Sequence, residues 1–130
     1  MDVKRIKEAA EGCLMEQVEL LKEFARVDCE SKDIEGNRRV VDIAKRVLSD
    51  IEGIEIKEDF FEGTGAHIVA RICPERPEGK IVVNCHMDTV FPKGFAEKNP
   101  PFIDEDNWLH GLGVGDCKGG FAVSAYAIKI

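Results

Sequence analysis

The spacing of apolar residues changes partway along the chain, and this change limits the possible folds more than any other feature. In residues 3–24, and again in residues 40–51, apolar side chains recur at helical spacing, which predicts two amphipathic helices. Either Ser31 or Asn37 is a suitable N-cap for the second helix, and Gly53 is expected to end it. The first part of the chain is therefore expected to be helical.

Beyond residue 53 the pattern becomes that of β-strands. Ile54 and Ile56 alternate with charged residues, which predicts a half-exposed strand. A second strand is expected at residues 67–72. A third is expected at residues 80–85, and we expect it to be buried because this short run is β-branched and apolar. The turns between these strands are expected at residues 63–65 and 74–79.

The last third of the sequence combines a loop, a hairpin and a helix. Prolines interrupt residues 89–101, so this connection is expected to be irregular. Residues 104–107, Asp-Glu-Asp-Asn, lie between two apolar pairs, which predicts a hairpin. A calcium-binding loop is not expected here, because Trp108 stands where such a loop needs another oxygen ligand. The glycine-rich residues 111–120 then lead into an apolar, buried helix at 121–130. This order of elements indicates an α/β sandwich.

Charge and composition argue against several classes of partner. The chain has 18 Lys and Arg against 25 Asp and Glu, a formal net charge of −7, so it lacks the clustered basic charge that nucleic acids and anionic membranes require. Its N-terminus lacks the apolar core of a signal peptide, and no apolar run approaches the about 18 residues that span a bilayer. The odd, scattered cysteines favour reduced thiols in the cytoplasm. They are Cys13, Cys29, Cys73, Cys85 and Cys117.

His86 and Asp88 follow the third predicted strand. Side chains two residues apart on a strand share a face, so these two are expected to point the same way, and Cys85 the opposite way. In metal sites a carboxylate accepts a hydrogen bond from one ring nitrogen of a histidine while the other nitrogen binds the metal. By spacing alone, a polar pair where a strand leaves the core is the commoner arrangement, and it is the residue types that permit a metal site.

The glycine-rich segment does not match the usual phosphate-binding loops. No Gly-Lys-Ser/Thr is present, and Asp116 occupies the last glycine position of the dinucleotide-binding pattern, where its charge would repel a phosphate. The segment is either a close approach of backbone to a site where Asp116 faces a cation, or a turn that Asp116 caps. His67 and His110 are expected to be structural, and no Gly-x-Ser-x-Gly elbow supports a serine hydrolase.

Two stretches resemble the motifs of a known enzyme family. Residues 84–92, Asn-Cys-His-Met-Asp-Thr-Val-Phe-Pro, are similar to the first metal motif of the co-catalytic zinc hydrolases. These include glutamate carboxypeptidases, aminoacylases, acetylornithine deacetylases and succinyl-diaminopimelate desuccinylases. Residues 111–120, Gly-Leu-Gly-Val-Gly-Asp-Cys-Lys-Gly-Gly, resemble the second motif, and residues 24–28 also fit, so the resemblance covers nearly the whole chain. It implies a three-layer αβα catalytic domain.

The resemblance also implies roles for individual residues. His86 would bind one of two zinc ions, and Asp116 would bridge both ions. Asp88 would be a catalytic residue that orients His86 through a hydrogen bond without binding the metal itself. Cobalt and manganese are alternative metals. A cis peptide bond between Asp116 and Cys117 is implied as well. The expected reaction is hydrolysis of an amide bond beside a free carboxylate, in a small peptide or an N-acyl amino acid.

The same resemblance implies that residues 1–130 are the N-terminal portion of the catalytic domain. The general-base Glu, the remaining ligands and the smaller lid domain, through which family members form homodimers, are expected beyond Ile130. The final predicted helix also has no capping residue. The chain alone is therefore expected to bind zinc poorly and to be inactive. Two alternatives are a non-catalytic relic or interaction module that keeps the fold, and a nucleotide-binding α/β domain.

Overall fold

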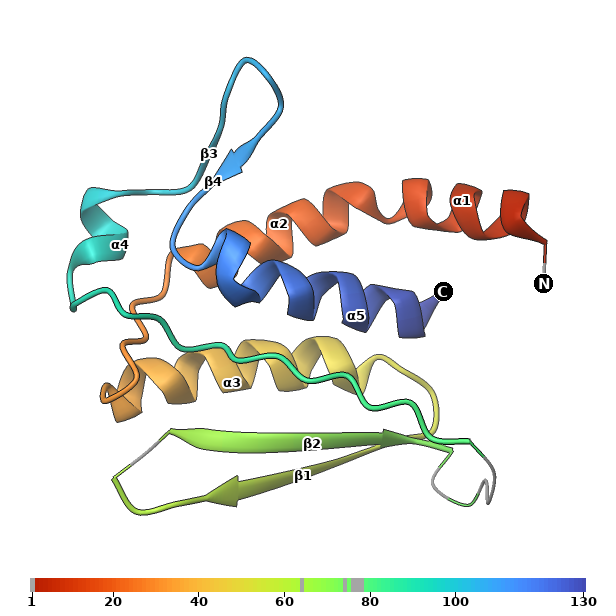
Figure 1. Cartoon of the computed structure of the whole chain (residues 1–130), viewed down its shortest axis with the longest axis horizontal. Coiled ribbons are helices and arrows are strands. Elements are labelled where there is room, and N and C mark those ends of the chain that lie inside the picture. The colour runs from red at the N-terminus through yellow and green to blue at the C-terminus, as the bar shows by residue number, and fades with distance from the viewer. Residues whose placement is uncertain (1, 64, 74, 76–78) are drawn as a thin grey trace.

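The computed structural model describes residues 2–63, 65–73, 75 and 79–130, and it combines helices with two small antiparallel sheets (Figure 1). The predicted mixture of helices and strands is confirmed at this level. The helices are α1 (Val3–Gly12), α2 (Leu14–Ala25), α3 (Ile34–Ser49), the single turn α4 (Phe95–Lys98), the kinked turn η1 (Val114–Lys118) and α5 (Gly119–Lys129). The strands are β1 (Ile54–Phe60), β2 (Ala66–Ile72), β3 (Phe102–Ile103) and β4 (Leu109–His110).

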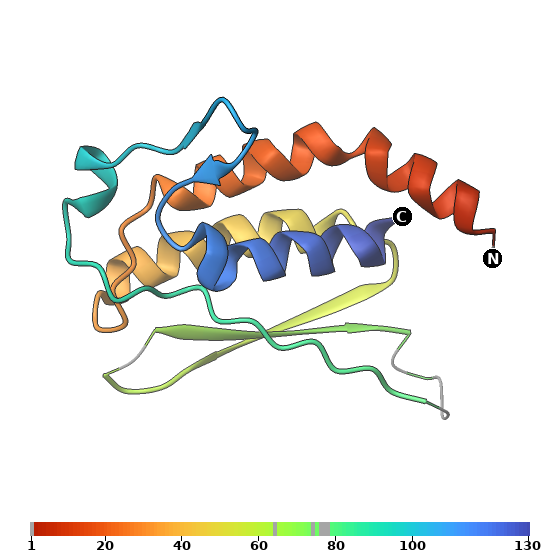
Figure 2. The same cartoon turned by 45° about the horizontal axis from the view of Figure 1, so that its top comes forward.

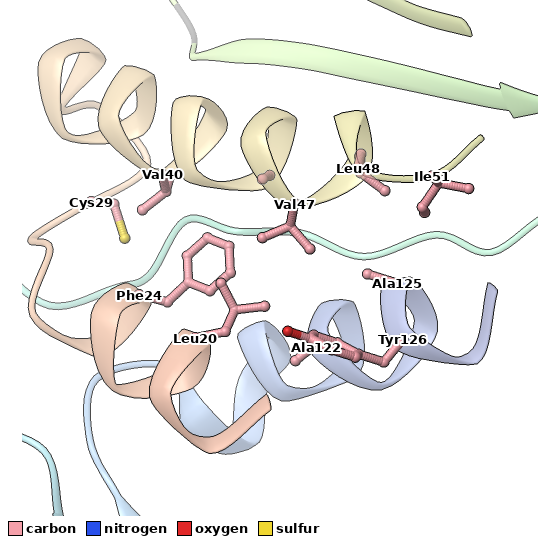
Figure 3. Packing of buried hydrophobic residues seen from close by; sticks show 11 residues of the cluster. Leu20, Phe24, Cys29, Val40, Val47, Leu48, Ile51, Ala122, Ala125 and Tyr126 are labelled. Carbon is pink, nitrogen blue, oxygen red and sulfur yellow. The ribbon is translucent and has the colours of Figure 1, made fainter. Parts of the chain in front are cut away.

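The core is formed mainly by α2, α3 and α5. Helix α3 lies between the β1–β2 hairpin and the pair α2 and α5 in Figure 1, and in Figure 2 helices α3 and α5 overlap between α2 and the hairpin. Phe24 is fully buried in this core, between α2 and α3 (Figure 3). Its ring also contacts the Phe121 ring edge to face, with the ring centroids 5.5 Å apart. Burying a side chain of this size contributes about 1.5–3 kcal/mol. Other core residues include Leu20, Val40, Ala44, Val47, Leu48, Ala122, Ala125 and Tyr126.

The N-terminal helical region differs from the prediction in two details. The expected single helix is two helices, because the chain leaves helical geometry at Cys13, just after the poor helix former Gly12. The N-cap of α3 is Asp33, whose carboxylate accepts a hydrogen bond from the Gly36 amide, and not Ser31 or Asn37. The Asn37 side chain lies inside the first turn and bonds to loop carbonyls instead.

The first two predicted strands pair with each other, and the predicted hairpin around residues 104–107 is also present. In the β1–β2 hairpin, Ile54 pairs with Ile72 at one end and Phe60 pairs with Ala66 at the other. Position 64 of the turn predicted at residues 63–65 lies outside the described residues, and so does much of the turn predicted at residues 74–79. In the second hairpin β3 pairs with β4, and the Asp104 carboxylate accepts hydrogen bonds from backbone amides within its turn.

The prediction of a buried strand at residues 80–85 is wrong. This segment is extended but belongs to neither sheet, and the side chains of Ile81 and Val82 are 94% and 86% exposed. A β-branched run specifies an extended backbone, whereas burial requires neighbouring strands and covering helices. The first backbone pairing comes four residues beyond this segment, where the Thr89 amide donates a hydrogen bond to the Cys29 carbonyl at 2.8 Å.

The connection at residues 89–101 is anchored by Asp28. It is irregular as predicted, except for the turn α4. The Asp28 carboxylate accepts hydrogen bonds from the amides of Gly94, at 2.7 Å, and Ala96, at 2.8 Å. Although burial raises the pKa of Asp28, these amides outweigh burial and hold its pKa below the ordinary value.

Among the described residues, no helix combines the length and apolar character needed to cross a membrane.

Candidate metal centre

His86 and Asp116, thirty residues apart in the sequence, meet in the structure. The Nε2 atom of His86 lies 2.9 Å from the Oδ1 atom of Asp116. His86 comes from the extended segment that leads to the Thr89 bridge, and Asp116 comes from η1. The two residues that sequence analysis selected as metal ligands are therefore neighbours.

Asp88 lies on the other side of the imidazole. Its Oδ1 atom is 3.3 Å from the Nδ1 atom of His86, and its backbone carbonyl oxygen is 3.1 Å from the same nitrogen. The prediction that His86 and Asp88 share a face is confirmed. Cys85 faces away, toward Gly120 of α5. The ring of His86 is thus held between two carboxylates, one at each nitrogen.

Ser31 completes this arrangement, and sequence analysis assigned it no place in the site. Its hydroxyl donates a hydrogen bond to the Oδ2 atom of Asp88. The contact exists because Glu30 and Thr89 form a parallel β-bridge, in which the Ser31 amide donates a hydrogen bond to the Thr89 carbonyl. A serine 57 residues away in sequence carries no local signal of such a contact.

Asp116 is placed by an irregular backbone. Its φ of −141° and ψ of 96° break helical geometry inside η1, and the peptide bond to Cys117 is cis, which confirms that expectation. Gly113, with a φ of 71°, lets the chain turn into η1. Asp116 does not cap the following helix, since the N-cap position of α5 is Lys118.

Lys118 ties η1 to the end of α2, and sequence analysis did not identify this role either. Its side chain is fully buried, and its Nζ atom donates to the carbonyl oxygens of Phe24, at 2.9 Å, and Val27, at 3.4 Å. Burial lowers the pKa of Lys118, against the opposing influence of Cys29 and Asp28. A lysine usually marks the surface, so its sequence position gave no sign of this role.

The His86–Asp116 pair borders a pocket of about 400 Å³. The Asp116 side chain is 91% exposed and that of His86 is half exposed, so both are accessible from solvent. An adjoining pocket of about 530 Å³ has more aromatic walls, with the Phe91 and Phe95 rings stacked at 4.3 Å. Phe91 and Gly111 line both pockets.

The donor types fit a zinc ion, although they fill only part of its coordination shell. Two ligands of one tetrahedral zinc, each about 2.0–2.1 Å from the metal, lie about 3.3 Å apart. His86 Nε2 and Asp116 Oδ1 are 2.9 Å apart, so a small movement would admit an ion between them. Asp88 faces the opposite ring nitrogen, and across the described ranges no three such side chains gather around one ion.

The remaining histidines have structural contacts, as expected. The Nε2 atom of His110 lies 2.7 Å from Asp104 Oδ2, and its ring stacks on Phe102. The ring of His67 packs against Phe61. Neither histidine lines the pocket at His86.

We expect His86 of the metal-free chain to titrate at a raised pH. The hydrogen bond that the His86 ring donates to the Asp116 carboxylate is the main reason that the pKa of His86 lies above the ordinary value, and Asp88 adds to it. The stabilisation from charged His86 is therefore present below the unfolded pKa of about 6.5 and is lost as pH rises through the folded pKa. NMR titration in chelator should show the shift, and Asp116→Asn should reduce it.

Asp104→Asn is the matched control for this titration, because Asp104 makes the equivalent contact with His110. It should leave the pKa of His86 unchanged. An equal fall in both variants would mean that net charge, and not the contact with Asp116, sets the titration.

Comparison with known proteins adds no family assignment. The chain matches no family model, and a search of curated proteins gave no significant match.

Proposed function

We propose that this chain is part of a zinc-dependent amide hydrolase, a peptidase or an N-acyl-amino-acid deacylase. The observation that carries the proposal is the His86 ring, which lies between Asp116 and Asp88 beside an accessible pocket. This is the arrangement in which a histidine binds a metal through one nitrogen while a carboxylate holds the other. The substrate class we propose is a small peptide or an N-acyl amino acid.

Each side chain has a separate task in this proposal. His86 binds metal through Nε2, and Asp88, itself held by Ser31, fixes the ring and its tautomer. Asp116 has two carboxylate oxygens on a largely exposed side chain, so it is suited to bridging two ions. When bound, the metal pair supplies an activated water and polarises the scissile carbonyl.

The proposal requires further ligands. Structural and catalytic zinc sites use three or four protein donors per ion, and His86 and Asp116 together supply one nitrogen and two carboxylate oxygens for two ions. We propose that residues 1–130 form the N-terminal portion of a three-layer αβα domain whose other segments supply the general base and the remaining ligands. The exposed Ile81 and Val82 support this, because an extended apolar segment is suited to pairing within a larger sheet.

The decisive experiment measures metal and activity on the protein from the complete reading frame. Wild type should hold about two zinc ions per chain and hydrolyse a member of a panel of dipeptides and N-acyl amino acids. His86→Ala and Asp116→Ala should each lower the rate at least about 100-fold and reduce bound zinc, because both remove a ligand. Asp88→Ala should lower zinc affinity by about 10–100-fold, the usual effect of losing a carboxylate that orients a ligand.

Asp104→Ala is a suitable control, since it removes a carboxylate from a histidine outside the pocket. It should retain zinc and activity. A complete protein that binds no metal and hydrolyses none of the panel would support a non-catalytic relic. Turnover by residues 1–130 alone would contradict the need for further ligands.

A further inference from the structure

The sulfurs of Cys85 and Cys117 both lie close to Gly120 of α5. A Cβ atom built on Gly120 would lie 3.2 Å from the sulfur of Cys117 and 3.7 Å from that of Cys85. Both sulfurs therefore face the same small space, which is available because residue 120 has no side chain. The two thiols also interact with each other, and Cys85 interacts with Ser124 of α5.

The position of this pair relative to the site is specific. Cys85 directly precedes His86, and Cys117 directly follows Asp116. The two sulfurs lie near Gly120, while the adjacent residues His86 and Asp116 contact each other. A bond between the sulfurs would join those segments within one residue of each proposed ligand.

We propose that Cys85 and Cys117 are a reversible dithiol–disulfide pair that controls the geometry of His86 and Asp116. A disulfide requires an S–S distance of about 2.05 Å and Cβ atoms about 3.5–4.5 Å apart. Its formation draws the two segments together and displaces the His86 ring relative to the Asp116 carboxylate. The bond itself needs no zinc, so it does not depend on the proposed function.

The oxidant is a small-molecule disulfide. One cysteine, once deprotonated, attacks a sulfur of the oxidant, and the S–S bond of the oxidant breaks to release one thiolate, which takes up a proton. The second cysteine then loses its proton and attacks the mixed disulfide, releasing a second thiol. Two cysteine thiols are oxidised by two electrons in total, and one oxidant disulfide is reduced to two thiols.

The other cysteines have different surroundings. Cys29 is fully buried and donates to the Met87 carbonyl, and Cys13 contacts Ala10 and Gln17 on its own helical segment. Cys73 is exposed after β2. Cys73 therefore serves as the control for oxidation that depends on exposure alone.

The test treats the metal-free chain with mixtures of oxidised and reduced glutathione. Peptide mapping after alkylation should find Cys85 linked to Cys117, with a mass loss of about 2 Da. Cys73→Ser should form this bond as completely as wild type, whereas Cys117→Ser should reduce intramolecular cross-linking at least about 10-fold and stop at the mixed disulfide. Wild-type peptide mapping gives the answer even if a variant folds poorly.

A second measurement tests the coupling. Oxidation should shift the NMR signals of the His86 ring in wild type and in Cys73→Ser, and it should leave them unchanged in the double variant Cys85→Ser/Cys117→Ser, which can form neither the disulfide nor the mixed disulfide next to His86. A dominant linkage to another cysteine, or no linkage at all, overturns the pair. A Cys85–Cys117 disulfide that leaves the His86 signals in place overturns its control of the site.

Discussion

Replacing Lys118 with alanine should cost about 3–5 kcal/mol of the free energy of unfolding, measured by urea denaturation. The substitution removes a fully buried side chain and its hydrogen bonds to the carbonyls of Phe24 and Val27. Those carbonyls lie at the end of α2, and the Phe24 carbonyl also accepts a hydrogen bond from the Val27 amide at 3.2 Å. Loss of the anchor should also loosen η1 and hence the position of Asp116.

Lys118→Met separates packing from polar contacts. It restores most of the volume and should recover part of the loss, leaving about 1–3 kcal/mol for the hydrogen bonds that are lost. The exposed Lys98, substituted in the same way, should change stability by less than about 0.5 kcal/mol. Equal losses in both methionine variants would contradict a special role for Lys118.

The lowered pKa of Lys118 gives a further signature. Between its folded pKa and the unfolded value of about 10.4, the unfolded chain binds more protons at this site. The free energy of unfolding should therefore gain a contribution from Lys118 as pH rises through that window. This contribution should be absent from Lys118→Met, and unfolding curves at several alkaline pH values would measure the difference.

Gly36→Ala should destabilise the protein by about 1–3 kcal/mol, although alanine is the better helix former by about 1 kcal/mol. A Cβ on Gly36 would overlap the carbonyl oxygen of Asp28 and lie 2.7 Å from a carboxylate oxygen of Asp33. The loop at residues 28–33 would have to move away from α3. That movement would also displace Ser31 from Asp88.

Gly12→Ala is the matched control for Gly36→Ala. Gly12 ends α1, and an added Cβ there meets no atom within 4 Å. This variant should be neutral or stabilised by up to about 1 kcal/mol. Thermal or urea unfolding of the two variants would compare helix propensity with close packing. Similar changes in the free energy of unfolding of Gly12→Ala and Gly36→Ala would mean that the loop next to Gly36 moves away from the added Cβ without destabilising the protein.

Local patterns were sufficient for much of the secondary structure. The alternation around Ile54 and Ile56 correctly predicted β1, and the apolar pairs around residues 104–107 correctly predicted a hairpin. These features depend on side-chain period and turn composition, which act over a few residues. The break at Cys13 and the cap at Asp33 were missed because several nearby residues fit those positions equally well.

The candidate site was only partly visible in the sequence. His86 and Asp88 could be assigned to one face because they are two residues apart on an extended chain. The motif resemblance brought Asp116 to the same site. Ser31 and Lys118 carried no comparable signal, since their roles depend on contacts with Asp88 and Phe24 that span 57 and 94 residues.

The sequence by itself determined where the chain is helical or extended, and which side chains near residue 86 share a face, because backbone periodicity is a local property. The tertiary structure decided what those elements meet. It left Ile81 exposed where an apolar pattern predicted burial, and it buried Lys118, although lysine side chains are usually exposed. Burial and pairing depend on distant segments packing together, and a single stretch of sequence does not contain that information.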